Sequence, residues 1–199
     1  MKIIGICGGS GSGKGTVGKL FNKENIPVID TDALYHELTS ADSPCLRELV
    51  ALFGDSIVVS GALDRRALAN IVFATGAEER RAQLNTVTHR HILDRAREIL
   101  SQYEKDGFSY AAVDAPLLFE SGFNKECDVI VCVVSPKEQR IARIMLRDGI
   151  TREAAEHRID AQLSDSFIIE NSDFVIYNDA TEEDLARAVC DVIRKLKEK

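Results

Sequence analysis

The chain begins with an apolar segment that runs directly into a glycine-rich loop. Residues 2–7 read KIIGIC, and the loop from Gly8 to Thr16 reads GGSGSGKGT. A strand, a glycine-rich loop and a helix in this order bring backbone N–H groups and the positive end of a helix dipole to one point, where a phosphate can bind. The loop matches G-x-x-x-x-G-K at Gly8, Gly13 and Lys14, and so predicts a nucleotide site. A glycine–serine turn that binds nothing is the weaker interpretation, because strand, spacing and lysine occur together.

The residue after the loop lysine departs from this pattern. A serine or threonine at that position normally contacts Mg²⁺, whereas this chain has Gly15 followed by Thr16. Thr16 is rotated by about 100° around the helix, so it cannot simply replace the missing hydroxyl. We expect Thr16 to lie nearer the α-phosphate, and Mg²⁺ to depend on phosphate oxygens, water and a carboxylate. Small nucleotide kinases resembling adenylate kinase share this G-K-G-T ending, which favours phosphotransfer to a small molecule over a GTPase switch.

Composition excludes several classes of protein. The chain has 199 residues, of which 45% are hydrophobic and 29% charged, as in an ordinary globular domain. A formal net charge of −7 argues against a general partner of nucleic acid or of an anionic membrane surface. No apolar run approaches the roughly 18 residues that span a bilayer, and no signal sequence is recognisable, so we expect a cytoplasmic protein. The five cysteines and four histidines lack metal-ligand spacing, and no zinc site is expected.

Five short apolar runs predict the strands of a parallel sheet. They lie at residues 2–7, 26–30, 109–114, 128–134 and 173–177, and they lack the alternation of a sheet with one solvated face. A final helix is expected from Thr181, where Asp184 completes a capping box. About 80 residues separate the second and third strands, and helical patterns at 43–53, 64–74 and 77–104 fill them. The sequence therefore predicts a doubly wound α/β domain with a helical insertion for a second substrate, and a further helical excursion from 136 to about 170.

Carboxylates follow two of the predicted strands. Ligands of open α/β sheets bind beyond the carboxyl ends of the strands, where Asp30, Asp32 and Asp114 are expected. A kinase that acts on a hydroxyl needs a carboxylate to orient the acceptor and take its proton. We assign this role to Asp32 and a supporting one to Asp30, while one of the two could instead cap the next helix. Asp114 is a candidate for the region of the magnesium ion, or alternatively a capping residue.

Arginines follow the fourth predicted strand. Arg140, Arg143 and Arg147 are spaced at i, i+3 and i+7, so they share one face of a helix. Positioned guanidinium groups stabilise the negative charge that spreads over a phosphoryl group during transfer. We interpret Arg143 and Arg147 as part of a closing lid that excludes water. For Arg152, which begins the next helix, a solvated surface position with i,i+4 partners is the preferred interpretation.

Taken together and in order, these segments resemble the dephospho-CoA kinase family across essentially the whole chain. The matching segments are GICGGSGSGKGT, IPVIDTDALYHEL, LDRRALANIVF, DAPLLFESG, RIARIMLRDGITREAAEHRIDAQ and SDFVIYND. The resemblance implies a three-layer P-loop kinase fold with a parallel sheet of about five strands. It also implies one domain in three parts: a nucleotide-binding core (1–32, 108–136 and 171–199), a helical acceptor-binding insertion (33–107) and a helical lid (137–170). The implied reaction transfers the γ-phosphoryl group of ATP to the ribose 3′-hydroxyl of dephospho-CoA.

The resemblance also implies roles for individual residues. Asp32 would act as the base, with Lys14, Arg143 and Arg147 as the other catalytic residues. ATP would be held by Gly11, Ser12, Gly13, Lys14, Gly15 and Thr16. The acceptor would be contacted by Asp32, Arg65, Arg66, Asp114, Leu117 and Glu120, and Mg²⁺ by Asp32 and Asp114. Arg65 and Arg66 could equally be a surface pair at a helix start, and Glu120 an ordinary polar residue.

Two departures from the family pattern and two rival functions accompany this interpretation. The family usually has serine or threonine at position 15, and His-Pro where this chain has His89 and Arg90. One rival is a kinase of the same fold with another acceptor, such as a nucleoside monophosphate. The other is a nucleotide-binding switch whose hydrolysis drives a conformational change. The oligomeric state stays open between a monomer and a weak homo-oligomer.

Overall fold

The computed structural model describes residues 1–40 and 42–198. It divides into two compact units, one made of residues 1–29 and 102–199 and the other of residues 30–101. Each unit has its own hydrophobic core. Over the described ranges, none of the helices combines the length and the apolar character that a bilayer crossing requires.

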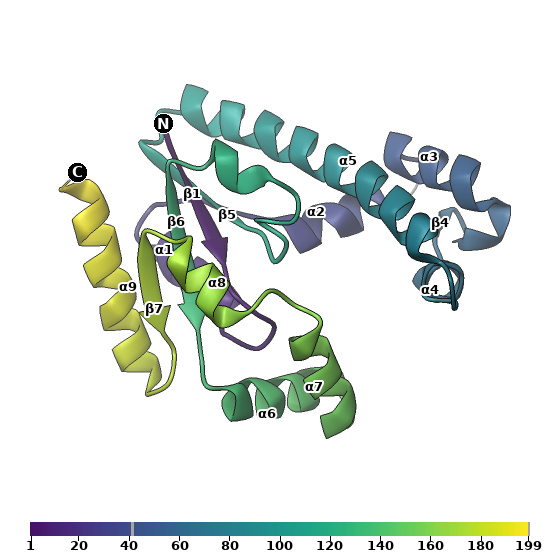
Figure 1. Ribbon diagram of the computed structural model, residues 1–199. Helices are drawn as coiled ribbons and strands as arrows, with labels where there is room; N and C mark the ends of the chain where they lie inside the picture. The colour runs from purple at the N-terminus through teal and green to yellow at the C-terminus, as the bar shows by residue number, and fades with distance from the viewer. Residues whose placement is uncertain (41, 199) are drawn as a thin grey trace. The chain divides into compact units, whose positions relative to one another are not determined.

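The first unit is built around a five-stranded sheet (Figure 1). The strand order is β2-β5-β1-β6-β7, and β1 pairs in parallel with both β5 and β6, as β7 does with β6. The strands are β1 (Lys2–Cys7), β2 (Val28–Asp30), β5 (Tyr110–Asp114), β6 (Val129–Val134) and β7 (Phe174–Tyr177). The five predicted strands and the doubly wound arrangement are therefore confirmed. Because the strand order reverses around β1, the glycine-rich loop leaves the sheet at its switch point, where such sheets bind ligands.

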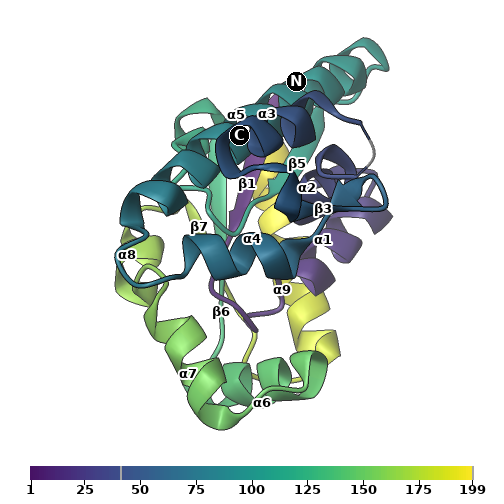
Figure 2. The same cartoon turned by 90° about the vertical axis from the view of Figure 1, so that its right-hand side faces the viewer.

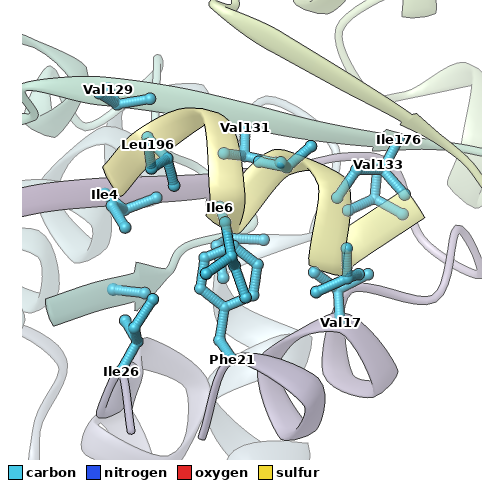
Figure 3. Packing of buried hydrophobic residues seen from close by; sticks show 14 of the residues in the cluster. Ile4, Ile6, Val17, Phe21, Ile26, Val129, Val131, Val133, Ile176 and Leu196 are labelled. Atoms are coloured by element: carbon cyan, nitrogen blue, oxygen red, sulfur yellow. The ribbon is translucent and has the colours of Figure 1, made fainter. Parts of the chain in front are cut away.

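Helices cover one face of this sheet. The helices α1 (Lys14–Lys23) and α9 (Glu182–Lys197) pack against β1, β6 and β7. Figure 3 shows Phe21 of α1 against Ile6 of β1, with Val17 and Ile4 on either side, and all four side chains are fully buried. The predicted capping box at the start of α9 is confirmed, since Thr181 and Asp184 exchange backbone-to-side-chain hydrogen bonds of 3.2 Å.

The opposite face is covered by residues 115–127, which include the short helix η2 (Phe123–Glu126), and by α8 (Asp165–Glu170). Gly5 of β1 faces this layer, and a Cβ atom there would lie 2.9 Å from both Leu118 and Cys127. Two covering layers on a parallel sheet give the predicted three-layer α/β architecture.

Two helices follow β6 at the carboxyl edge of the sheet. The helices α6 (Lys137–Asp148) and α7 (Arg152–Asp160) lie side by side (Figures 1 and 2). Ile141 and Ile144 of α6 pack on Ala155 and Ile159 of α7. This pair occupies the region for which the sequence predicts a lid, and the division of the domain into three parts stays a prediction.

The second unit is helical. Its elements are α2 (Thr31–Leu38), α3 (Pro44–Phe53), η1 (Asp55–Ile57), β3 (Val58–Val59), β4 (Ala62–Leu63), α4 (Arg65–Val72) and α5 (Glu78–Lys105), the last four residues of which belong to the first unit. The core includes Cys45, Leu49 and Phe53 of α3 and Leu68 and Val72 of α4. The helices predicted at 43–53, 64–74 and 77–104 are confirmed, whereas the antiparallel β3–β4 hairpin was not predicted.

Candidate active site

The loop between β1 and α1 is held by side chains that bind its backbone carbonyl groups. These side chains come from α1, from α6 and from the segment after β7. The donor–acceptor distances are 2.8 Å for Lys14 Nζ to Gly8 O, 2.9 Å for Arg140 Nε to Ser10 O, 3.1 Å for Arg143 Nη1 to Gly11 O and 2.7 Å for Asn178 Nδ2 to Ser12 O. Four carbonyl oxygens of this short loop therefore accept hydrogen bonds from side chains.

This anchoring also sets the direction of the N–H groups. In a trans peptide the C=O of one residue and the N–H of the next point in opposite directions. Fixing the carbonyl groups of Ser10 and Ser12 therefore turns the N–H groups of Gly11 and Gly13 away from Arg140 and Asn178. Gly13 is the N-cap residue of α1, so its N–H lies where the helix dipole adds partial positive charge, and Gly11 precedes it by two residues. The arrangement suits a phosphate group.

Close packing explains why the loop is rich in glycine. A Cβ atom on Gly9 would lie 2.0 Å from Arg140 Nη2, and one on Gly13 would lie 2.2 Å from Asn178 Nδ2. Gly13 also has a φ of 102°, a conformation that side chains rarely adopt. Gly15 differs from both, since it is exposed and a Cβ atom there would meet no described atom within 4 Å. Packing thus requires glycine at positions 9 and 13 and would permit a side chain at position 15.

Two hydroxyl residues of the loop have different surroundings. Ser12 is 1% exposed, and its Oγ has no hydrogen-bond partner within residues 1–40 and 42–198. Thr16 is exposed in the first turn of α1. The predicted ATP contacts of Gly11 to Thr16 stay predictions.

Asp114 lies beside the start of the loop. It is the last residue of β5 and pairs in register with Ile6 of β1, one residue before Cys7. Burial raises the pKa of the Cys7 thiol to about 12, while the charge of Lys14 lowers this pKa and that of Asp114 raises it. The charges of Lys14 and Asp114 therefore both act on the carboxyl end of β1. The predicted acceptor residues Leu117, 43% exposed, and Glu120, also exposed, follow in the same segment.

The three arginines of α6 divide into two environments. Arg140 and Arg143 bind loop carbonyl groups, and Arg143 also donates a hydrogen bond of 3.0 Å to Ser135 Oγ. Arg147, in the last turn, pairs with Asp148 through bonds of 2.7 and 2.8 Å. Arg147 and then Arg158 hold the pKa of Asp148 down at about 2. The predicted catalytic roles of Arg143 and Arg147 stay predictions.

Arg152 lies at the surface of α7. It makes the expected i,i+4 pair with Glu156 at 2.7 Å and a second pair with Glu138 at the same distance. These contacts agree with the interpretation of Arg152 as a solvated residue.

In the second unit, Asp30 and Asp32 have distinct positions. Asp30 is the N-cap of α2, and its Oδ1 accepts hydrogen bonds from the backbone N–H groups of Asp32 at 2.9 Å and Ala33 at 3.1 Å. The capping interpretation thus applies to Asp30. Asp32 is exposed in the first turn of the helix. Its predicted roles as base and metal ligand stay predictions.

Arg65 belongs to a cluster that the sequence did not reveal. Its Nη1 lies 3.2 Å from Nε2 of His36, and its guanidinium carbon lies 5.7 Å from the centre of the Tyr35 ring. Burial is the main cause that raises the pKa of Tyr35, and the charge of Arg65 opposes it. Neighbouring Arg66 is exposed and gives its backbone N–H to Asp64, the N-cap of α4. The Tyr35 ring therefore attracts the guanidinium of Arg65 and helps to hold it in place.

Comparison with known proteins identifies the family. A family model described as dephospho-CoA kinase (CoaE) matches residues 2–184. The chain belongs to the dephospho-CoA kinase family. It is 35% identical to a dephospho-CoA kinase of Corynebacterium glutamicum over 186 residues, which cover 93% of this chain and 92% of the relative.

Solved structures agree with this membership. A dephospho-CoA kinase from Campylobacter jejuni superimposes with a TM-score of 0.73 at 26% identity, covering 100% of this chain and 98% of that one. A protein from Thermus thermophilus, TT1252, gives a TM-score of 0.83 at 35% identity and covers 98% and 97% of the two chains. The P-loop kinase fold that the sequence predicts is thereby confirmed, and a kinase of this family takes ATP as a substrate.

Several residues that bind the glycine-rich loop of this chain were not predicted from the sequence. Asn178 lies 166 residues from Ser12 along the chain, and Gln162 lies 152 residues from Ser10. The segments DAQ and YND that contain them resemble the family, but neither carries a local pattern that indicates a loop contact.

Proposed function

We propose that this protein transfers the γ-phosphoryl group of ATP to the ribose 3′-hydroxyl of dephospho-CoA, giving coenzyme A. One observation supports the proposal most directly. The loop whose Gly11 and Gly13 N–H groups point away from Arg140 and Asn178 lies within residues 2–184, which match the dephospho-CoA kinase family model. As an enzyme of coenzyme A biosynthesis, it would work in the cytoplasm.

For the donor, Gly11 to Thr16 would bind the phosphates of ATP. The N–H groups of Gly11 and Gly13 would donate to phosphate oxygens, and Lys14 would exchange its bond to Gly8 O for the β- and γ-phosphates. Arg143 and Arg147 would stabilise the charge on the phosphoryl group as it moves. For Arg143, the bond that it already donates to Gly11 O supports a position next to the donor.

For the acceptor, Asp32 would orient the 3′-hydroxyl and accept its proton. Its exposure in the first turn of α2 leaves the carboxylate accessible to a ligand, while Asp30 caps the helix. Arg65 and Arg66 would meet the anionic groups of dephospho-CoA, and the Tyr35 ring would hold the guanidinium of Arg65 in place. Leu117, Glu120 and Asp114 would complete the acceptor contacts.

We propose Mg²⁺ as the metal ion that accompanies ATP. Mg²⁺ binds oxygen ligands and commonly uses one or two carboxylates together with substrate phosphates. Asp114 beside the loop and Asp32 would supply the carboxylates, since Gly15 has no hydroxyl to offer. When bound, the ion would neutralise charge on the β- and γ-phosphates.

An acceptor screen tests the function. The protein, ATP and Mg²⁺ are mixed in turn with dephospho-CoA, AMP, CMP, GMP and adenosine, and ADP formation is followed. We expect stimulation by dephospho-CoA. Stimulation by another acceptor alone would mean a different kinase of the same fold. ATP-dependent binding of a partner, without acceptor-stimulated ADP release, would instead favour the nucleotide switch.

A further inference from the structure

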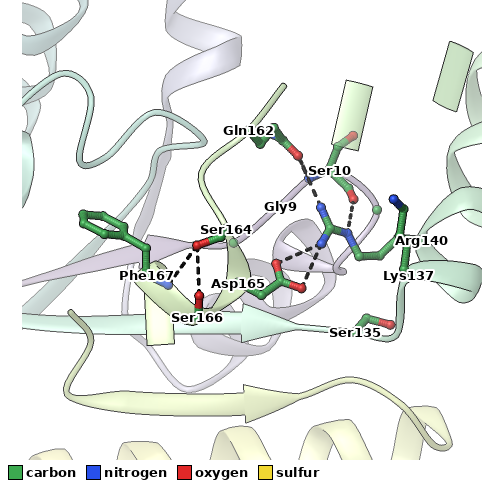
Figure 4. Close-up of polar contacts among 12 residues, drawn as sticks. Gly9, Ser10, Ser135, Lys137, Arg140, Gln162, Ser164, Asp165, Ser166 and Phe167 are labelled. Atoms are coloured by element: carbon green, nitrogen blue, oxygen red, sulfur yellow. Dashed lines mark hydrogen bonds and ion pairs between the residues drawn. The ribbon is translucent and has the colours of Figure 1, made fainter. Parts of the chain in front are cut away.

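Arg140 is a buried cation that the proposed reaction does not use. Its side chain is 4% exposed, in contrast to the 60% exposed side chain of Arg147 on the same helix. Figure 4 shows its guanidinium surrounded by Ser10, Gln162 and Asp165. A buried guanidinium is stable only when its donors are satisfied, and here every nitrogen has a described acceptor.

Arg140 and Gln162 together fix both backbone groups of Ser10. Arg140 Nε donates to the carbonyl oxygen of Ser10 at 2.9 Å. The N–H of Ser10 donates to Gln162 Oε1 at 2.8 Å, and Arg140 Nη2 lies 3.3 Å from the same oxygen. The two side chains therefore support each other while they hold the peptide bonds on either side of Ser10.

Asp165 supplies the compensating charge. Its carboxylate accepts from Arg140 Nη1 at 2.9 and 3.2 Å, so the guanidinium keeps a fixed orientation. Arg140 Nη2 also occupies the space in which a Cβ atom of residue 9 would lie, so the guanidinium packs directly on the backbone of Gly9.

We propose that Arg140 is a positioning residue for ATP, and that Gln162 and Asp165 hold it in place. This inference rests on the proposed function. By fixing the carbonyl of Ser10, Arg140 keeps the N–H of Gly11 directed toward the phosphates. A rotated peptide would instead present a carbonyl oxygen to an anion, and preorganisation of the donor group would be lost.

The test combines nucleotide binding with steady-state kinetics. Arg140→Met is compared with Arg140→Lys. Lysine keeps the charge but lacks the planar guanidinium whose separate N–H groups bind Ser10 and Asp165 at the same time. A hydrogen bond to a charged group contributes enough that we expect Kd and KM for ATP to rise about 10- to 100-fold in Arg140→Met. The increase should be smaller in Arg140→Lys, and KM for dephospho-CoA should stay unchanged.

Two further variants keep the inference falsifiable. Gln162→Leu should weaken ATP binding in the same direction, and combining it with Arg140→Met should be less than additive, because both act on Ser10. Arg152→Met, a surface arginine on the neighbouring helix, is the matched control and should leave both constants unchanged. If Arg140→Met destabilises the fold, the ATP affinity of Gln162→Leu alone still tests whether fixing Ser10 matters for ATP binding.

The outcomes separate this inference from the proposed function. ATP affinity that is unchanged in Arg140→Met and in Gln162→Leu overturns the inference, whether or not thermal stability falls. Equilibrium ATP binding is measured without an acceptor. If dephospho-CoA does not stimulate the wild-type protein, the proposed function is refuted. The ATP affinities of the variants would still test the role of Arg140.

Discussion

Asn178 donates a hydrogen bond of 2.7 Å from its side-chain amide to the carbonyl oxygen of Ser12. Asn178 is 9% exposed and follows β7, so a residue from the end of the sheet closes the part of the loop that leads into α1. The same amide nitrogen lies 2.2 Å from the position of a Cβ atom on Gly13. A side chain at position 13 and the Asn178 contact therefore exclude each other.

Gly13→Ala should weaken ATP binding by at least about 10-fold. A non-glycine residue in a left-handed conformation costs roughly 1–2 kcal/mol, and the added methyl group would also displace Asn178 from the loop. Isothermal titration with ATP measures the loss.

Gly107→Ala is the matched control for Gly13→Ala. Gly107 has a φ of 85°, but a Cβ atom there meets no described atom within 4 Å. It should lower stability by a similar amount and leave ATP affinity unchanged. Equal losses of ATP affinity in both variants would show that the collision with Asn178 is unimportant.

Gly15→Ser should retain ATP binding and preserve or strengthen the response to Mg²⁺. The position is exposed and open, and serine would restore the hydroxyl that such loops normally offer to the ion. Activity measured against Mg²⁺ concentration should give a half-saturation point that is equal or lower. A complete loss of ATP binding would mean that position 15 does not tolerate a side chain beside the bound nucleotide.

Asp32→Asn should lower kcat by at least about 10²-fold while ATP binding persists. The substitution removes the proton acceptor but keeps the size and the helical position of the side chain. Asp30→Asn is the control, because asparagine caps a helix as well as aspartate does. Turnover that is unchanged in Asp32→Asn would remove Asp32 from the mechanism.

The sequence predicted elements that local patterns determine. The apolar strands, the long helices and the Thr181–Asp184 capping box were all recognisable because each depends on neighbours within a few residues. The β3–β4 hairpin was missed because its strands have two residues each, too few for an alternation to be seen. Its turn did leave a sequence signal, because the dipeptide Ser60-Gly61 is typical of turns. In the structure both residues have positive φ values, 53° and 80°, as in a tight hairpin turn.

The contacts that shape the candidate site are different in kind. Helical spacing put Arg140 and Arg143 on one face, but it could not show that both bind loop carbonyls about 130 residues earlier in the chain. For the same reason the sequence favoured Arg147 as strongly as Arg143, although Arg147 pairs with Asp148. Only the tertiary structure distinguishes Arg143, which binds the loop, from Arg147, which pairs with the last residue of its own helix.

Asp148 links the end of α6 to α7, which leads to a pH-dependent prediction. Its carboxylate pairs with Arg147 of α6 and Arg158 of α7. Asp148→Asn should lower the free energy of unfolding by up to about 1 kcal/mol at neutral pH, as for partly exposed ion pairs. A carboxylate at a helix C-terminus is unfavourable by itself, so a loss of stability would mean that the two arginines outweigh the dipole.

The pH dependence follows from the lowered pKa of Asp148. This pKa falls from an ordinary value of 3.8 to about 2 in the folded protein, first through Arg147. The carboxylate therefore stabilises the fold above its unfolded pKa, and this contribution is lost as the pH falls through the folded pKa. Urea denaturation of the wild type and Asp148→Asn should show a constant difference above about pH 5 and about half of it near pH 3. A difference that grows as the pH falls would contradict the assignment.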